Sequence, residues 1–266
     1  MKNYFFIFIT CSLLLCCHHE QNEPIIPEEP EPEPEAPYVM PCGCGDEWYH
    51  EEITCNDDLP WDYPIKPETE EWDRMTYPEQ LDACQIPEEV LTSLSTEDLT
   101  KICLQYPFLL ETLFLGSHYE QGLNSIFRNF NGIRKLFQRE DVAKELLKQY
   151  RYVIQISPES TREFSTLKIW ALELILTRYQ SSDDSKDNYM EIVQYLVCGY
   201  KKKLMYPEIF SNGLNFYARA IILLKINEKN LESIPQNGSN GVFQNGHCDE
   251  LTERAINDLS CQYINQ

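Results

Sequence analysis

The sequence is poor in basic residues, and the deficit is concentrated near its start. The chain holds 22 lysines and arginines against 43 aspartates and glutamates, a net charge of −21. Residues 18–73 contribute −17 of that charge and contain a single base, Lys66. The remaining residues are mildly acidic and show no basic patch with interleaved aromatics, so nucleic acid is excluded as an expected partner.

The local motifs of common catalytic sites are also missing. There is no Gly-x-Ser-x-Gly elbow, no Walker loop and no dinucleotide-binding glycine fingerprint. Of five histidines, only His118 and His247 fall within residues 78–266. No catalytic residue is therefore assigned, although two carboxylates far apart in sequence would act as a hydrolase pair without leaving a local trace.

Only one long hydrophobic run is present, and it is too short to cross a bilayer. Residues 4–15 are almost wholly apolar, which suits a signal peptide, whereas a membrane-spanning helix needs about 20 residues. The following residues resemble a bacterial lipobox, with Leu14 at −3 and the small Cys16 at −1 of Cys17. We therefore predict a signal peptide over residues 1–17 and covalent lipid on Cys17, with Cys16 as the alternative acceptor.

Residues 18–37 are expected to form an extended tether. The sixteen residues Asn22–Pro37 include six prolines and six glutamates. Proline fixes φ and like charges repel, so a polyproline-like spacer of about 3.1 Å per residue, or about 50 Å, is expected. An acidic stretch after a lipidated cysteine is also similar to the surface-export signals of Bacteroidetes lipoproteins. This indicates an exported protein of the outer membrane or cell surface, with a simple solvated spacer as the alternative.

Residues 38–77 keep the prolines and acids but add aromatic rings. Three of the four tryptophans lie here, namely Trp48, Trp61 and Trp72. Because disordered tails are poor in aromatics, we expect this segment to run extended across a helical domain, with its rings as packing anchors. The alternative is a stacking platform for sugars built from the three tryptophans.

Eight of the eleven cysteines lie beyond the signal segment, an even number that permits disulfides in an exported chain. Cys84 with Cys103, and Cys248 with Cys261, are candidate pairs if their helices are neighbours.

An alternative for the first cysteines is a metal site. Cys42, Cys44, His50 and Cys55 offer three thiolates and an imidazole, a legitimate structural zinc set. The Cys-x-Cys spacing matches no common zinc knuckle, so we assign neither a metal nor any cofactor beyond the covalent lipid.

Residues 78–266 predict an all-α domain, because their periodicity is helical and strand signals are nearly absent. Ser95 should cap a helix, since Ser95–Asp98 has the pattern of a capping box. Asn131-Gly132 is expected to break one helix, and residues 227–248 to form a long loop. The predicted helices cover about 87–94, 99–106, 108–115, 119–130, 133–138, 142–153, 157–179, 185–205, one from 207 that includes 217–226, and 249–263.

A weak internal repeat relates two of these helices. Glu97-Asp98-Leu99-Thr100-Lys101 with Leu104 matches Glu140-Asp141-Val142-Ala143-Lys144 with Leu147, at an offset of 43 residues. That offset lies in the range of HEAT and armadillo repeats. Two architectures stay open: an irregular multi-helix bundle, or a short HEAT/armadillo-like helical stack.

Several short motifs between about residues 87 and 152 are similar to a family of uncharacterised exported lipoproteins of gut Bacteroidetes. They are Ser95-Thr96-Glu97, Cys103-Leu104-Gln105-Tyr106-Pro107, Phe130-Asn131-Gly132, Leu136, Arg139, Asp141, Leu146-Leu147 and Tyr150. The resemblance implies an exported origin and a helical fold, and it supplies no activity.

These observations together predict a binding or scaffold domain anchored to a membrane through its lipid, accessory to a surface assembly that handles peptides or glycans. Its partner would be a protein or a glycan. The alternatives are a glycan- or peptide-hydrolase that uses a carboxylate pair, and a structural envelope protein.

Overall fold

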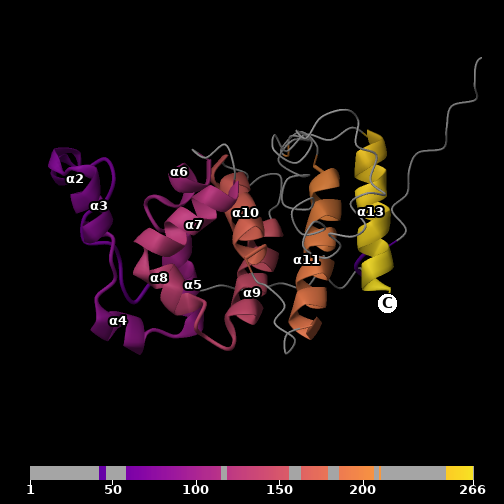
Figure 1. Ribbon diagram of the computed structural model, residues 1–266, viewed down its shortest axis with the longest axis horizontal. Helices are drawn as coiled ribbons and strands as arrows, with labels where there is room; N and C mark the ends of the chain where they lie inside the picture. The colour runs from indigo at the N-terminus through magenta and orange to yellow at the C-terminus, as the bar shows by residue number, and fades with distance from the viewer. Residues whose placement is uncertain are drawn as a thin grey trace, which may run out of the picture. The chain divides into compact units, whose positions relative to one another are not determined.

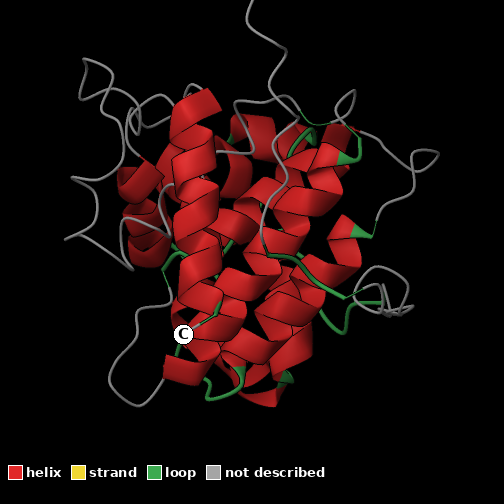
Figure 2. Cartoon of the chain, turned by 90° about the vertical axis from the view of Figure 1, so that its right-hand side faces the viewer, coloured by secondary structure: helices red, strands yellow, loops and turns green. Residues whose placement is uncertain are grey.

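The computed structural model describes residues 42–45, 58–114, 119–155, 163–178, 186–206, 210 and 250–265. They form helices and connecting turns with no strand among them, which confirms the all-α class (Figure 2). All belong to one folded unit, Tyr38–Gln266. The signal segment, the tether, the helix expected from Pro207 and the 227–248 loop lie outside the described residues.

The helices lie roughly in chain order from left to right in Figure 1. They are α2 (Glu70–Arg74), α3 (Tyr77–Ala83), α4 (Glu88–Ser93), α5 (Thr96–Leu104), α6 (Leu109–Phe114), α7 (Tyr119–Asn129), α8 (Asn131–Leu136), α9 (Val142–Ile154), α10 (Glu163–Leu176), α11 (Lys186–Leu204) and α13 (Glu250–Ile264). The predicted helices from 87 to 153 therefore exist, with ends shifted by a few residues.

Helix starts are set by short polar side chains. The Ser95 hydroxyl accepts a hydrogen bond from the backbone N–H of Asp98 at 3.1 Å, as predicted for an N-cap. Helix α2 was not predicted. It begins at the N-cap Thr69, whose hydroxyl accepts from the backbone N–H of Trp72 at 3.3 Å. Glutamates in its first turn complement the helix dipole.

The expected break between two helices is present, but it lies one residue before the Asn131-Gly132 pair. The chain leaves the helical conformation at Phe130, and Asn131 opens α8. The Asn131 amide accepts from the backbone N–H of Ile86 at 3.0 Å and donates to its carbonyl at 2.7 Å. A Cβ on Gly132 would lie 2.4 Å from the Phe130 ring and 2.8 Å from Ile86. Asn131 and Gly132 are therefore both required for close packing against Ile86, which lies just before α4.

The segment before α2 packs against the helices through its rings, as predicted for packing anchors. Tyr63 is buried, and its hydroxyl donates to the carbonyl of Ile102 at 3.0 Å. Trp61 meets Tyr63 edge-on at 4.9 Å between ring centroids. Trp72 is also buried, with its ring 5.2 Å from that of Phe108. Because Trp72 is buried, it cannot contribute to a sugar-stacking platform.

Packing proceeds from helix to helix along the chain (Figure 1). Helix α5 contacts α8 and α9, α9 contacts α10 and α11, α11 contacts α13, and α6 contacts α7. Helix α8 spans the residues 43 positions after α4, so the weak repeat matches a recurring pair of helices. The two copies touch: the Thr96 hydroxyl donates to Asp141 at 2.7 Å, and Lys148 pairs with Glu97 at 2.7 Å.

The centre of the fold is α10, whose side chains are apolar nearly all round. Ile169 and the run Ala171–Leu176 are buried, and only Glu173 in that run is charged. Its carboxylate accepts from the Tyr150 hydroxyl of α9 at 2.8 Å and pairs with the ammonium of Lys203 from α11. One polar cluster therefore joins three helices inside the core.

The disulfides differ from the pairs considered from the sequence. Cys42 bonds to Cys261 in α13, and Cys44 bonds to Cys198 in α11. The pairing of Cys261 with Cys248 was therefore wrong. Cys84 and Cys103 are buried free thiols, so their proposed bond was wrong as well.

Candidate functional site

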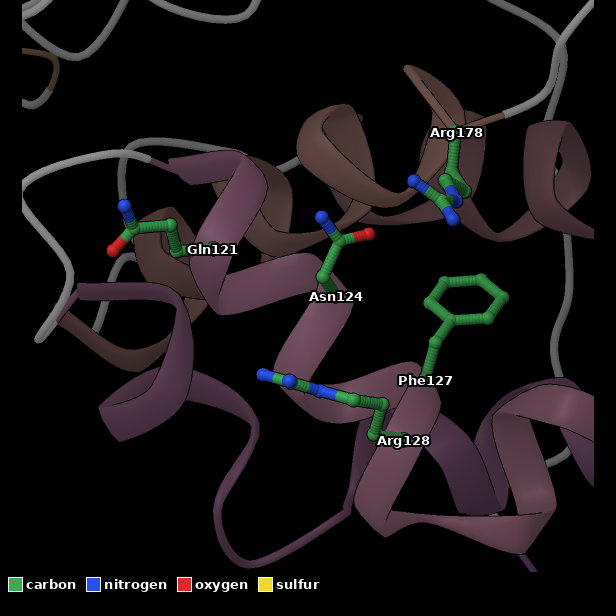
Figure 3. A pocket seen from close by; sticks show the side chains of 5 residues that line it. All are labelled: Gln121, Asn124, Phe127, Arg128 and Arg178. Carbon is green, nitrogen blue, oxygen red and sulfur yellow. The ribbon is translucent and has the colours of Figure 1, made fainter.

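The candidate site is an open pocket of about 590 Å³ between α7 and the end of α10 (Figure 3). Helix α7 supplies Gln121, Asn124, Phe127 and Arg128. Arg178 reaches in from the turn that follows α10. In Figure 3 the Arg178 side chain points toward Asn124 and Phe127, and Arg128 lies on the other side of Phe127.

Helical spacing explains why three of the polar side chains share one face. Gln121, Asn124 and Arg128 stand at i, i+3 and i+7, and all three are exposed. Leu123 and Ile126 between them are buried on the opposite side. Helix α7 thus buries an apolar face in the fold and exposes a polar stripe of two amides and an arginine to solvent.

Arg178 is held in place by an aromatic ring. Its guanidinium carbon lies 5.1 Å from the centroid of the Phe127 ring. Phe127 is in turn fixed edge-on against Phe137, with ring centroids 4.9 Å apart. A cation over an aromatic face at this distance gains about 0.5–1 kcal/mol at an accessible site. The stack orients the guanidinium but leaves its N–H edges available to a ligand.

The pocket carries positive charge that no acid neutralises. Across the described ranges, neither the Arg128 nor the Arg178 guanidinium makes an ion pair or a hydrogen bond to a carboxylate, and no acid lines the pocket. By contrast, Arg74 pairs with Glu70 at 2.7 Å on the surface. Two unneutralised arginines in a chain of net charge −21 are suited to bind an anion.

A second hollow, of about 610 Å³, is lined by acids and does not resemble a hydrolase site. Its carboxylates come from Glu70, Glu71 and Glu79. The backbone N–H and the hydroxyl of Thr76 donate to Glu79, each at 2.7 Å, and these bonds lower the pKa of Glu79. A general acid needs a raised pKa instead. This hollow therefore gives no support to the alternative of a carboxylate pair.

The residues singled out from the sequence do not meet at the pocket. Trp61 packs against Tyr63 and Trp72 is buried against Phe108, while Trp48 and the lipid acceptors Cys17 and Cys16 lie outside the described residues. Sequence reasoning missed all five lining residues. The polar stripe of α7 was visible as a helical pattern, but nothing local connects it with Arg178.

The alternative zinc cluster is also not assembled among the residues that can be placed. Cys42 and Cys44 are each disulfide-bonded and so provide no thiolate. His50 and Cys55 fall outside the described ranges. In the described part of the chain, no group of three or more histidine, cysteine or acidic side chains is placed to hold a metal ion.

Comparison of the chain with protein-family models, with curated proteins and with solved structures finds no match. Within the described ranges, no helix combines the length and the apolar content needed to cross a bilayer.

Proposed function

We propose that this chain is a membrane-anchored lipoprotein whose helical domain binds a carboxylate-bearing ligand in the pocket between α7 and α10. The observation that carries the binding proposal is the pair Arg128 and Arg178, which line one pocket and have no acidic partner among the described residues. The anchor rests on the lipobox-like sequence at Cys17 and on the tether, residues 18–37.

The chemistry of the lining favours a carboxylate attached to a polar molecule. A guanidinium presents parallel N–H donors that match the two oxygens of a carboxylate. The amides of Asn124 and Gln121 can donate to and accept from hydroxyl or amide groups beside that carboxylate. A volume of about 590 Å³ falls within the range of pockets that hold small ligands.

Two sources supply this chemistry, an acidic sugar and the free C-terminus of a peptide. Either ligand suits an accessory role in a surface assembly that handles glycans or peptides. Thermal unfolding would be followed with a uronic-acid oligosaccharide, its neutral hexose counterpart, a short peptide with a free C-terminus and the same peptide amidated. A ligand at 100 times its dissociation constant stabilises by about 2.7 kcal/mol, or roughly 5–11 °C for a domain of this size.

The proposal requires that only carboxylate-bearing ligands shift the melting temperature. Arg178→Gln and Arg128→Gln should each reduce the shift, and added salt should weaken it because the pocket is open to solvent. Arg74→Gln is the matched control, since Arg74 is an exposed arginine paired with Glu70 outside the pocket. Equal shifts with neutral and acidic ligands, or an equal loss in the Arg74 variant, would exclude the pocket as a carboxylate site.

The anchor has a separate test. Cells grown with labelled palmitate should label the wild-type chain and the Cys16→Ser variant, whereas Cys17→Ser should lose the label. Labelling of the Cys17→Ser variant would exclude Cys17 as the acceptor and assign the lipid to Cys16 or another residue.

A further inference from the structure

The chain that follows the tether is joined covalently to two helices from the far end of the sequence. Cys42 bonds to Cys261 of α13, 219 residues later, and Cys44 bonds to Cys198 of α11, 154 residues later. Helices α11 and α13 pack against each other (Figure 1). The Cys42-Gly43-Cys44 motif therefore bridges one pair of neighbouring helices.

Both disulfides end at buried cysteines of the helices. Cys198 is fully buried and Cys261 is 2% exposed. Between the cysteines, a Cβ on Gly43 would lie 2.5 Å from the Lys201 ammonium of α11, so Gly43 lies directly against that side chain. Two Cα positions separated by one residue are up to about 7 Å apart, enough for one sulfur to reach each of two neighbouring helices.

This connectivity decides where a pull on the tether enters the fold. Without the disulfides, force from the N-terminus would first load the segment before α2, whose contacts include the rings of Trp61 and Tyr63 and a hydrogen bond from Tyr63 to Ile102. With them, force passes from Cys42 straight into α13 and from Cys44 into α11. The residues between Cys44 and Cys198, including all those that line the pocket, are enclosed in a covalent loop.

We propose that Cys42-Gly43-Cys44 is a covalent clasp that takes up force arriving through the tether and keeps it away from α2 to α10. The role presumes the anchored tether of the proposed function, but it involves neither the pocket nor its ligand. An external dithiol opens the clasp: it is oxidised to its own disulfide and gives each protein disulfide two electrons and two protons, leaving two thiols.

The clasp predicts contour lengths that single-molecule pulling measures. The chain without its signal segment would be held at Asn22 and Gln266 through peptide tags free of cysteine. With Cys42–Cys261 closed, the extension should stop near about 90 Å, because only about 25 residues lie on the force path at about 3.4 Å each. A dithiol reductant should lengthen it to about 830 Å, the span of the unfolded chain between the handles.

Two variants separate the bonds. Cys42→Ser should extend to about 310 Å, since the path then runs through Cys44–Cys198, whereas Cys44→Ser should stay near about 90 Å. Extension of the oxidised wild type to about 830 Å would overturn the clasp, as would lengthening in Cys44→Ser but not in Cys42→Ser. If a variant fails to fold, the oxidised and reduced wild type still decide the question. The measurement needs no ligand and no lipid, so its outcome is independent of the proposed function.

Discussion

The polar cluster at the centre of the core provides the most demanding test of this structure. The Glu173 side chain is 3% exposed and that of Lys203 is 4% exposed. One oxygen of Glu173 accepts from both Lys203 and Tyr150, while the other, Oε2, is buried and has no hydrogen-bond partner among the described residues. Within the described part of the chain, Lys203 is thus the countercharge of the Glu173 carboxylate.

Removing one partner of the Glu173–Lys203 ion pair should destabilise the fold more than removing both. Lys203→Met leaves a buried carboxylate without its countercharge, and Glu173→Leu leaves a buried ammonium, so each should cost about 3–5 kcal/mol. The double variant buries no charge and should lose less than either single variant. Its remaining defect is that the Tyr150 hydroxyl loses its hydrogen bond to Glu173, at a cost of about 1–3 kcal/mol.

The assay is urea unfolding followed by circular dichroism, with all four members of the double-mutant cycle measured in the oxidised chain. For a domain of this size, a loss of 3–5 kcal/mol lowers the melting temperature by roughly 6–20 °C. Lys168→Met is the matched control, since it removes the same charge from an exposed position on α10 and should stay within about 0.5 kcal/mol of wild type.

Two results would refute this reasoning. Losses below about 1 kcal/mol in both single variants would mean that the pair is not buried as the structure has it. A double variant whose loss equals the sum of the single losses would mean that Glu173 and Lys203 do not interact.

Three further predictions concern neighbouring features. Gly199→Ala should destabilise the fold by about 1–3 kcal/mol in urea unfolding, despite alanine's better helix propensity, because its Cβ would lie 1.8 Å from the Tyr150 hydroxyl. Burial raises the pKa of Cys84 to about 12 and also raises that of Cys103, so iodoacetamide at pH 8 should modify both thiols, by peptide mapping, only after unfolding. Hydrogen bonds from Lys101 and Lys148 lower the pKa of Glu97. The stability that the Glu97 carboxylate contributes is therefore present above its ordinary pKa and lost as pH falls. In urea unfolding, Glu97→Gln should lower the free energy of unfolding by up to about 1 kcal/mol at pH 7 and leave it unchanged near pH 2.

Much of the fold was accessible from local patterns because the forces that select a helix act within a few residues. The Ser95 cap, the apolar run of α10 and the stripe of α11 each follow from spacing and side-chain chemistry along one segment. The break expected at Asn131-Gly132 lies at Phe130 instead, because Asn131 and Gly132 pack against Ile86 and Phe130, which propensity does not register. Helix α2 was missed since a five-residue helix leaves little periodicity to detect.

The pocket and the disulfides were inaccessible for a different reason. Arg178 joins Phe127 and Arg128 across about fifty residues of sequence, and Cys42 meets Cys261 across 219. Nothing within either segment specifies its distant neighbour, and nearby cysteines such as Cys84 and Cys103 suggested pairs that do not form. Connectivity of this kind depends on how the helices stack.

By itself, the sequence determined the helical class of the domain, the approximate helix ends from residue 87 to 153, the burial of α10 and the anchoring role of Trp61 and Trp72, because these depend on periodicity, capping and ring size. Only the tertiary structure decided that Glu173 would find Lys203 and Tyr150, that two arginines would share a pocket, and that the residues after the tether would be locked to α11 and α13. Those features need contacts between segments far apart in the chain, and such contacts exist only once the helices have packed.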